Sequence, residues 1–111
     1  MKIKQFDIWI ADLNPRMGTG KIRPVLVVQT DLLNSEHPST IICPITTVVQ
    51  PESEILRVHL KKGVARLKED CDIMIDQLRA IDNKRLLKKT GTISGIQEEK
   101  VRQNLRIIFD L

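Results

Sequence analysis

A small set of polar side chains falls at the expected borders between strands and loops, where binding and catalytic groups concentrate. The set comprises Thr19, Lys21, Arg23, Thr46, Thr47, Asp76, Gln77 and Arg79. It contains no activated nucleophile suited to splitting a peptide bond. The sequence also lacks a zinc-protease HExxH, a glycine-rich phosphate loop, a GxSxG turn and a carboxylate cluster suited to a divalent metal. His37 and His59 stand apart, so we expect both to be solvated surface residues.

RNA cleavage is the reaction that suits such a set, because RNA carries its own nucleophile. The ribose 2′-OH attacks the adjacent phosphorus, so the protein need only move protons and neutralise the pentavalent phosphorane. The guanidinium of Arg23 offers a planar fork of donors to phosphate oxygens, and the hydroxyl of Thr46 adds a further hydrogen bond. This route requires no metal and no cofactor, and it spares DNA, which lacks the 2′-OH. The residues leave open which group is the general base and which is the acid.

Arg23 is placed by the stretch 21–29, in which a cation and a proline lead into a β-branched aliphatic strand. The preceding segment, 14–20, holds a proline and two glycines and reads as a loop. A charged side chain at such a junction is held steady by the strand beside a surface that can move. We predict strands over residues 7–13, 23–29, 40–49, 55–60, 71–76 and 90–93.

Two of these strands alternate between apolar and polar residues. The pattern predicts that one face is buried, and that the outward positions are Arg57, His59, Asp72, Met74 and Asp76. A short helix is predicted over 82–89 with Asp82 as its cap, and Ser94 with Gln97 predicts a capping box that opens an amphipathic terminal helix. These elements favour a small, strongly bent antiparallel barrel or half-barrel with helical attachments.

Composition bounds the class of protein. The chain has 111 residues, which suits a single domain over 1–111, and its hydrophobic share of 41% is that of a globular protein. A net charge of +4 favours a polyanionic partner. No apolar run is long enough to span a bilayer and the N-terminus does not resemble a signal peptide, so we expect a cytoplasmic protein without membrane contact. Cys43 and Cys71 lie in apolar runs, which predicts buried free thiols.

The order of several short motifs resembles the MazF/PemK toxin family over nearly the full length. The motifs are Asp7-Ile8-Trp9-Ile10-Ala11-Asp12-Leu13-Asn14-Pro15, Gly18-Thr19, Arg23-Pro24-Val25, Pro44-Ile45-Thr46 and Asp76-Gln77-Leu78-Arg79-Ala80-Ile81-Asp82. The resemblance implies an SH3-like β-barrel with short helices, a homodimer, and metal-independent endoribonuclease activity on single-stranded RNA. It also implies a cognate antitoxin whose flexible, acidic tail occupies the RNA groove.

The resemblance assigns roles residue by residue. Arg23 and Thr46 match the family's catalytic arginine and Ser/Thr, and Thr19 falls at a substrate-contacting Ser/His position. Asp76 and Gln77 match the polar pair before the Arg-x-Ile-Asp segment, where some members use the aspartate in acid/base work. We expect substrate contacts from Asp76 and Gln77, and also from Lys21 and Arg79 of the polar set. Two positions depart from the family pattern: Gly20 replaces a frequent glutamate, and Met74 replaces the arginine that some members pair with the aspartate. The sequence therefore favours Arg23 with Thr46 over a mechanism that uses an arginine–aspartate pair.

Two other functions compete with RNA cleavage. The first is a DNA gyrase poison on the same barrel, similar to the CcdB proteins, which act through a C-terminal Trp-Gly-Ile tail. This chain ends Phe109-Asp110-Leu111 with no tryptophan nearby, which disfavours that reading. The second is a non-catalytic RNA-binding module.

Overall fold

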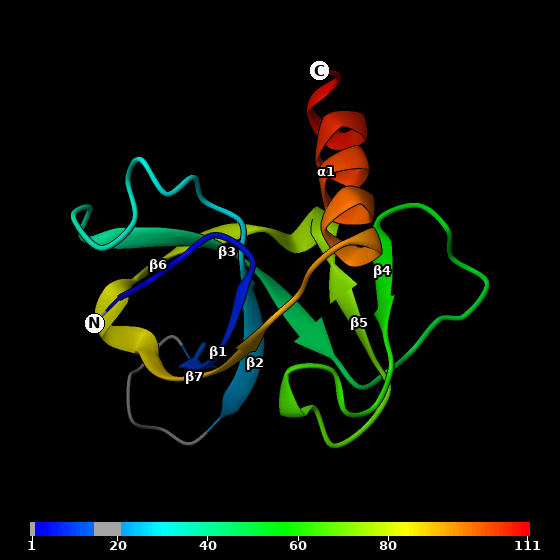
Figure 1. Cartoon of the computed structure of the whole chain (residues 1–111), viewed down its shortest axis with the longest axis horizontal. Helices are drawn as coiled ribbons and strands as arrows, with labels where there is room; N and C mark the ends of the chain where they lie inside the picture. The colour runs from blue at the N-terminus through cyan, green and yellow to red at the C-terminus, as the bar shows by residue number, and fades with distance from the viewer. Residues whose placement is uncertain (1, 15–20) are drawn as a thin grey trace.

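The structure is a computed structural model that describes residues 2–14 and 21–111 (Figure 1). The strands are β1 (Asp7–Asp12), β2 (Ile22–Val27), β3 (Ser39–Thr46), β4 (Arg57–Leu60), β5 (Cys71–Met74), β6 (Arg79–Asp82) and β7 (Leu86–Thr92). Three short 3-10 helices lie between them: η1 (Val64–Arg66), η2 (Ile75–Gln77) and η3 (Asn83–Arg85). The chain then forms one α-helix, α1 (Ile96–Phe109), in its described part.

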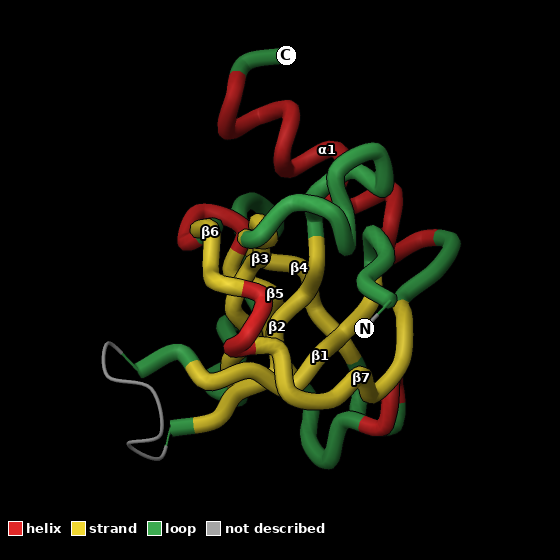
Figure 2. Tube along the Cα trace, turned by 90° about the vertical axis from the view of Figure 1, so that its left-hand side faces the viewer, coloured by secondary structure: helices red, strands yellow, loops and turns green. Residues whose placement is uncertain are grey.

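The strands make a seven-stranded antiparallel sheet in the order β4-β5-β3-β2-β1-β7, and β6 pairs with β3. The sheet is strongly curved, as the tube in Figure 2 shows. The prediction of a mainly β fold with a C-terminal helix is confirmed, and the SH3-like description is compatible with it.

Strand β3 is the centre of the arrangement. On one edge it pairs with β2, and on the other it pairs first with β6 and then with β5. The segment that joins β5 to β6 leaves the ladder as η2 near Pro44 of β3. A proline has no N–H to donate to a neighbouring strand, so an interruption of the ladder is expected beside it. This interruption places η2 and its polar residues between β5 and β6 on this edge of β3.

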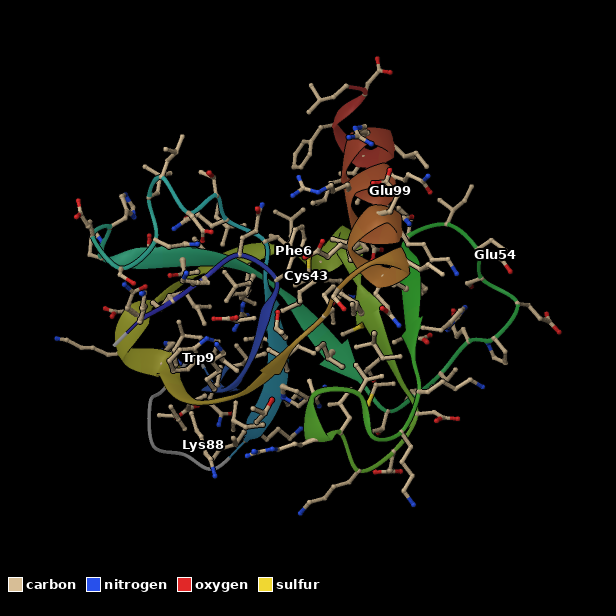
Figure 3. The ribbon with its side chains drawn as sticks, in the orientation of Figure 1. Phe6, Trp9, Cys43, Glu54, Lys88 and Glu99 are labelled. Atoms are coloured by element: carbon tan, nitrogen blue, oxygen red, sulfur yellow. The ribbon has the colours of Figure 1, made fainter. Side chains whose placement is uncertain are left out.

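The sheet packs a hydrophobic cluster on each face. The first cluster includes Phe6, Ile8, Leu26 and Cys43 and is covered by α1 and the β4–β5 pair, whereas the second includes Trp9. Figure 3 shows Phe6 and Cys43 near the foot of α1, with Trp9 on the side of β6 and β7. Alternation along a strand produces this division, because successive side chains point to opposite faces.

Two predictions about helices require correction. The helix expected over 82–89 is only the short η3, after which the chain continues as β7; the Asp82 carboxylate does accept from Lys84 N, at 2.9 Å. The capping box is wrong, because α1 begins at Ile96 after Gly95, whose φ is 57°, and no side chain caps it. Gly95 adopts this positive φ without the steric cost that a Cβ would bring.

The two cysteines lie in the protein interior. Cys43 and Cys71 are both buried free thiols, as predicted, and burial followed by the charge of Asp76 raises the pKa of Cys43 to about 12. Among the helices of the described residues, none has the length and apolar character needed to cross a membrane.

Candidate functional site

The candidate site begins where β2 and β3 lie side by side. Their antiparallel register pairs Val25 with Pro44 and Leu26 with Cys43. The paired residues end at Val25 and Pro44, and Arg23 and Thr46 each lie two residues beyond this last pair, on β2 and β3 respectively. Residues two apart on a strand share a face, so Arg23 and Thr46 belong to the face of Val25 and Pro44. Arg23 pairs with Ala11 of β1, and Thr46 pairs with Asp72 of β5, so each is held by a strand other than the one that carries the second residue.

A cleft of about 260 Å³ opens on this face of the sheet. Four of the predicted site residues line it: Lys21, Arg23, Gln77 and Arg79. Its remaining walls are Leu13, Asn14, Pro44 and Met74. Three cationic side chains and two amides thus line the cleft, with η2 supplying Gln77 and β6 supplying Arg79.

The other predicted site residues are not among those that line this cleft. Thr46 is half-buried at the end of β3 and does not line the cleft, and Asp76 is an exposed residue of η2 beside Gln77. Thr47, the neighbour of Thr46, lines a different hollow together with Pro24. Thr19 lies outside the described residues.

The end of β1 next to the cleft is held by two arginines from the β6–β7 region. Arg79 donates from Nη2 to the carbonyl of Leu13 at 3.0 Å, and Arg85 donates from Nη1 to the carbonyls of Asp12 and Asn14. The Asn14 amide then donates to the carbonyl of Lys21 at 3.3 Å. These bonds brace the start of β2 against the end of β1. Arg79 therefore has a structural contact in addition to its place in the cleft wall.

The hydroxyl of Thr46 is oriented by a tight turn. Its Oγ1 accepts from the backbone N–H of Val48 at 3.1 Å. A hydroxyl that accepts one hydrogen bond still has its own proton to donate. Thr46 is therefore prepared to donate to an oxygen of a bound group.

Asp72 is directly opposite Thr46 in the β3–β5 ladder, and it corrects the prediction that this residue points to solvent. Its side chain is fully buried and contacts the two outward-predicted residues of β4: Arg57 Nη1 lies 3.2 Å from Oδ2 and His59 Nδ1 lies 2.6 Å from Oδ1. Burial alone would raise the pKa of Asp72, but the hydrogen bonds from the Gln50 amide and His59, with the charges of His59 and Arg57, lower it overall. Burying a charged carboxylate is energetically costly unless it is paired and hydrogen-bonded in this way.

Sequence reasoning missed this network, although a signal for it existed. Arg57 and His59 were assigned to one face of a strand and Asp72 to the outer face of the next. The register pairs His59 with Asp72 across the ladder, where opposite charges stabilise a sheet. Cationic and anionic positions at matching phase in two successive strands therefore predict such a pair. No comparable pattern in the sequence indicates that Leu13 and Asn14 line the cleft.

The site defines a class of protein: a small, strongly curved β-sheet whose cleft, lined by three cations, suits a phosphate ester. Comparison with known families makes this specific. The model of the PemK-like, MazF-like toxins of type II toxin-antitoxin systems matches residues 4–109, so the chain belongs to this family.

Individual relatives agree with the assignment. Endoribonuclease EndoA of Bacillus subtilis (strain 168) is 33% identical over 113 residues, covering 100% of this chain and 97% of the relative. Two solved structures share the fold. Mycobacterium tuberculosis toxin MazF-mt6 has a TM-score of 0.78 at 24% identity and covers 95% of this chain and 97% of its own. The MazE–MazF structure from Deinococcus radiodurans (Form-III) has a TM-score of 0.80 at 18% identity and covers 98% and 97%.

Proposed function

We propose that this toxin cleaves single-stranded RNA with Arg23 of the cationic cleft and Thr46 at the end of β3 as its catalytic residues. The chain is a type II toxin and an endoribonuclease, as its family and its Bacillus subtilis relative indicate. The observation that supports this site is the cleft that gathers Lys21, Arg23 and Arg79 around Pro44 of β3. Cations clustered around a hollow attract a phosphodiester backbone.

In the proposed reaction, the 2′-oxygen of the ribose forms a bond to the adjacent phosphorus while the bond from phosphorus to the 5′-oxygen breaks. The 2′-OH loses its proton and the departing 5′-oxygen gains one, which leaves 2′,3′-cyclic phosphate and 5′-OH ends. Arg23 stabilises the negative charge that builds on the phosphorane oxygens, and the Thr46 hydroxyl donates a hydrogen bond to one of them while keeping its proton. This division of labour suits an arginine, which rarely gives up its proton.

The remaining site residues contact the substrate in this proposal. Lys21, Gln77 and Arg79 hold phosphate or base groups within the cleft. Asp76 of η2 and Thr19, which lies outside the described residues, are the other two substrate contacts. No metal or cofactor takes part.

The partners follow from the family. The structures of relatives with their antitoxins support an antitoxin as a partner of this chain. We propose that the acidic, flexible segment of that antitoxin covers the cationic cleft, and that the toxin is a homodimer. The gyrase-poison alternative is not favoured, because the family match covers residues 4–109.

The proposal is tested by incubating the purified protein with a mixed single-stranded RNA in excess EDTA. We expect discrete fragments with 2′,3′-cyclic phosphate ends. A second substrate carries a single 2′-deoxy nucleotide at the mapped cleavage position, and it should resist cleavage there because the nucleophile is missing. Cleavage of the deoxy substrate, or cleavage that stops in EDTA, would contradict the mechanism. Inhibition of DNA supercoiling without RNA cleavage would favour the gyrase alternative.

A further inference from the structure

The buried carboxylate of Asp72 has no part in the proposed chemistry, yet it is the most heavily contacted acid near Thr46. Oδ2 accepts from the Gln50 amide at 2.8 Å and from Arg57 Nη1 at 3.2 Å, and Oδ1 lies 2.6 Å from His59 Nδ1. The Asp72 side chain is fully buried. Such a group is costly to keep charged inside a protein unless every contact is in place.

These contacts fasten the segment that follows β3 to the β4–β5 pair at three points. Arg57 Nη1 donates to the carbonyl of Val48 at 3.2 Å, Asp72 accepts from the N–H of Gln50, and His59 Nε2 lies 3.0 Å from the carbonyl of Ser53. The attachments are spread over residues 48–53. The segment is therefore held by side chains of the neighbouring strands.

The attachment at Val48 reaches the proposed catalytic hydroxyl directly. The Val48 carbonyl accepts from Arg57, and the Val48 N–H donates to Thr46 Oγ1 at 3.1 Å. The same guanidinium nitrogen bonds Asp72, so one nitrogen joins the buried carboxylate to the turn that orients Thr46. Loss of this link frees the turn to rotate the hydroxyl away from its position.

Arg57 is set apart from the substrate-contacting cations by its surroundings. It does not line the cleft that holds Lys21, Arg23 and Arg79. Its side chain is only 17% exposed, and Nη1 is engaged by two oxygen atoms of the protein itself. What separates Arg57 from Arg79, which also bonds a protein carbonyl, is that Arg57 lies outside the cleft and bonds a buried carboxylate.

We propose that Arg57, anchored on Asp72, is a positioning residue that fixes the hydroxyl of Thr46 through the Val48 turn. The inference rests on the proposed function, because it gives Thr46 a catalytic role. It predicts that Arg57 acts on the rate of the chemical step and not on RNA binding. A displacement of a catalytic group by about 1 Å from a distant change costs on the order of a hundredfold in rate.

The test compares Arg57→Met, which keeps the aliphatic stem, with Arg57→Lys, whose ammonium can still bridge Asp72 and Val48. Arg106→Met is the matched control, because Arg106 forms an exposed ion pair with Glu99 on α1 and its loss removes the same charge. Two quantities are measured: kcat and KM on a single-stranded RNA whose cleavage position has been mapped, and amide hydrogen exchange at Val48 by NMR. Circular dichroism verifies that each variant is folded.

In Arg57→Met we expect kcat to fall by about ten- to a hundredfold with KM near that of the unmodified protein. Exchange at the Val48 amide should quicken in the same variant. Arg57→Lys should restore much of the kcat and much of the protection of the Val48 amide. Arg106→Met should change neither kcat nor exchange at Val48. An unchanged kcat in folded Arg57→Met, or a raised KM with unchanged kcat, overturns the proposal; the second result would make Arg57 an RNA contact. If the unmodified protein cleaves no RNA, the proposed function fails, while exchange at Val48 still shows whether Arg57 holds the turn.

Discussion

Arg23 and Thr46 are held by the fold in different ways. Arg23 is an exposed side chain at the start of β2, in the wall of an open cleft. Thr46 is half-buried, and its hydroxyl is oriented by the Val48 amide. An exposed guanidinium can follow a phosphate as its charge develops, whereas a hydroxyl must be placed beforehand to contribute. The two roles proposed for them match these two environments.

Asp72 should make the stability of the protein depend on pH. Its folded-state pKa lies below the ordinary value of 3.8, so the unfolded chain binds its proton more readily than the folded one. The resulting stabilisation is present above pH 3.8 and is lost as the pH falls through the lower folded-state pKa. We expect Asp72→Asn to lower the free energy of unfolding by about 1–3 kcal/mol at neutral pH.

Urea unfolding of both proteins at several pH values measures this effect. The difference between the unmodified protein and Asp72→Asn should shrink as the pH is lowered below 3.8, because both then carry a neutral side chain at this position. A difference that stays constant down to the most acidic condition would show that the charge of Asp72 is not what stabilises the fold.

At the scale of elements, the site depends on where β3 changes partners. β6 and β5 share one edge of β3, and η2 bulges out between them near Pro44. The sequence predicted β1 to β5 to within a few residues, because each is an apolar run bounded by turn residues. It did not predict that residues 86–89 belong to β7, because Leu86-Leu87-Lys88-Lys89 reads equally well as the end of a helix. Pairing with β1 makes these residues a strand, and such long-range pairing is not visible in a local sequence pattern.

The contact between β7 and η1 gives a prediction about packing. A Cβ at Gly91 would lie 2.7 Å from the Cα and 2.8 Å from the Cβ of Ala65, which is closer than real atoms approach. Gly91→Ala should therefore lower the free energy of unfolding by about 1–3 kcal/mol through overpacking.

Thermal or urea unfolding measures this change, with Lys88→Ala at an exposed position of the same strand as the control. Alanine normally suits a strand better than glycine does. A Gly91→Ala protein that is as stable as the unmodified one would mean that η1 does not pack against β7 as described.

At the scale of the whole molecule, the two faces of the sheet have separate tasks. One face carries the core under α1 and the β4–β5 pair, while the other carries the second core and, at its end, the cationic cleft. The sequence indicated Lys21, Arg23, Gln77 and Arg79 as site residues, and these four do meet in one cleft. The Arg57–Asp72 link is visible in the sequence only when the cationic positions of one strand are compared with the anionic position of the next, because each residue taken singly looks like a surface residue.

The most direct test of the account is the rate of RNA cleavage by Arg23→Ala. The side chain is exposed, so the variant should fold normally, which circular dichroism and thermal unfolding verify. Loss of the guanidinium should cost about 3 kcal/mol of transition-state stabilisation, or somewhat more than a hundredfold in rate. A folded Arg23→Ala protein that cleaves the mapped RNA at the unmodified rate would contradict the central claim.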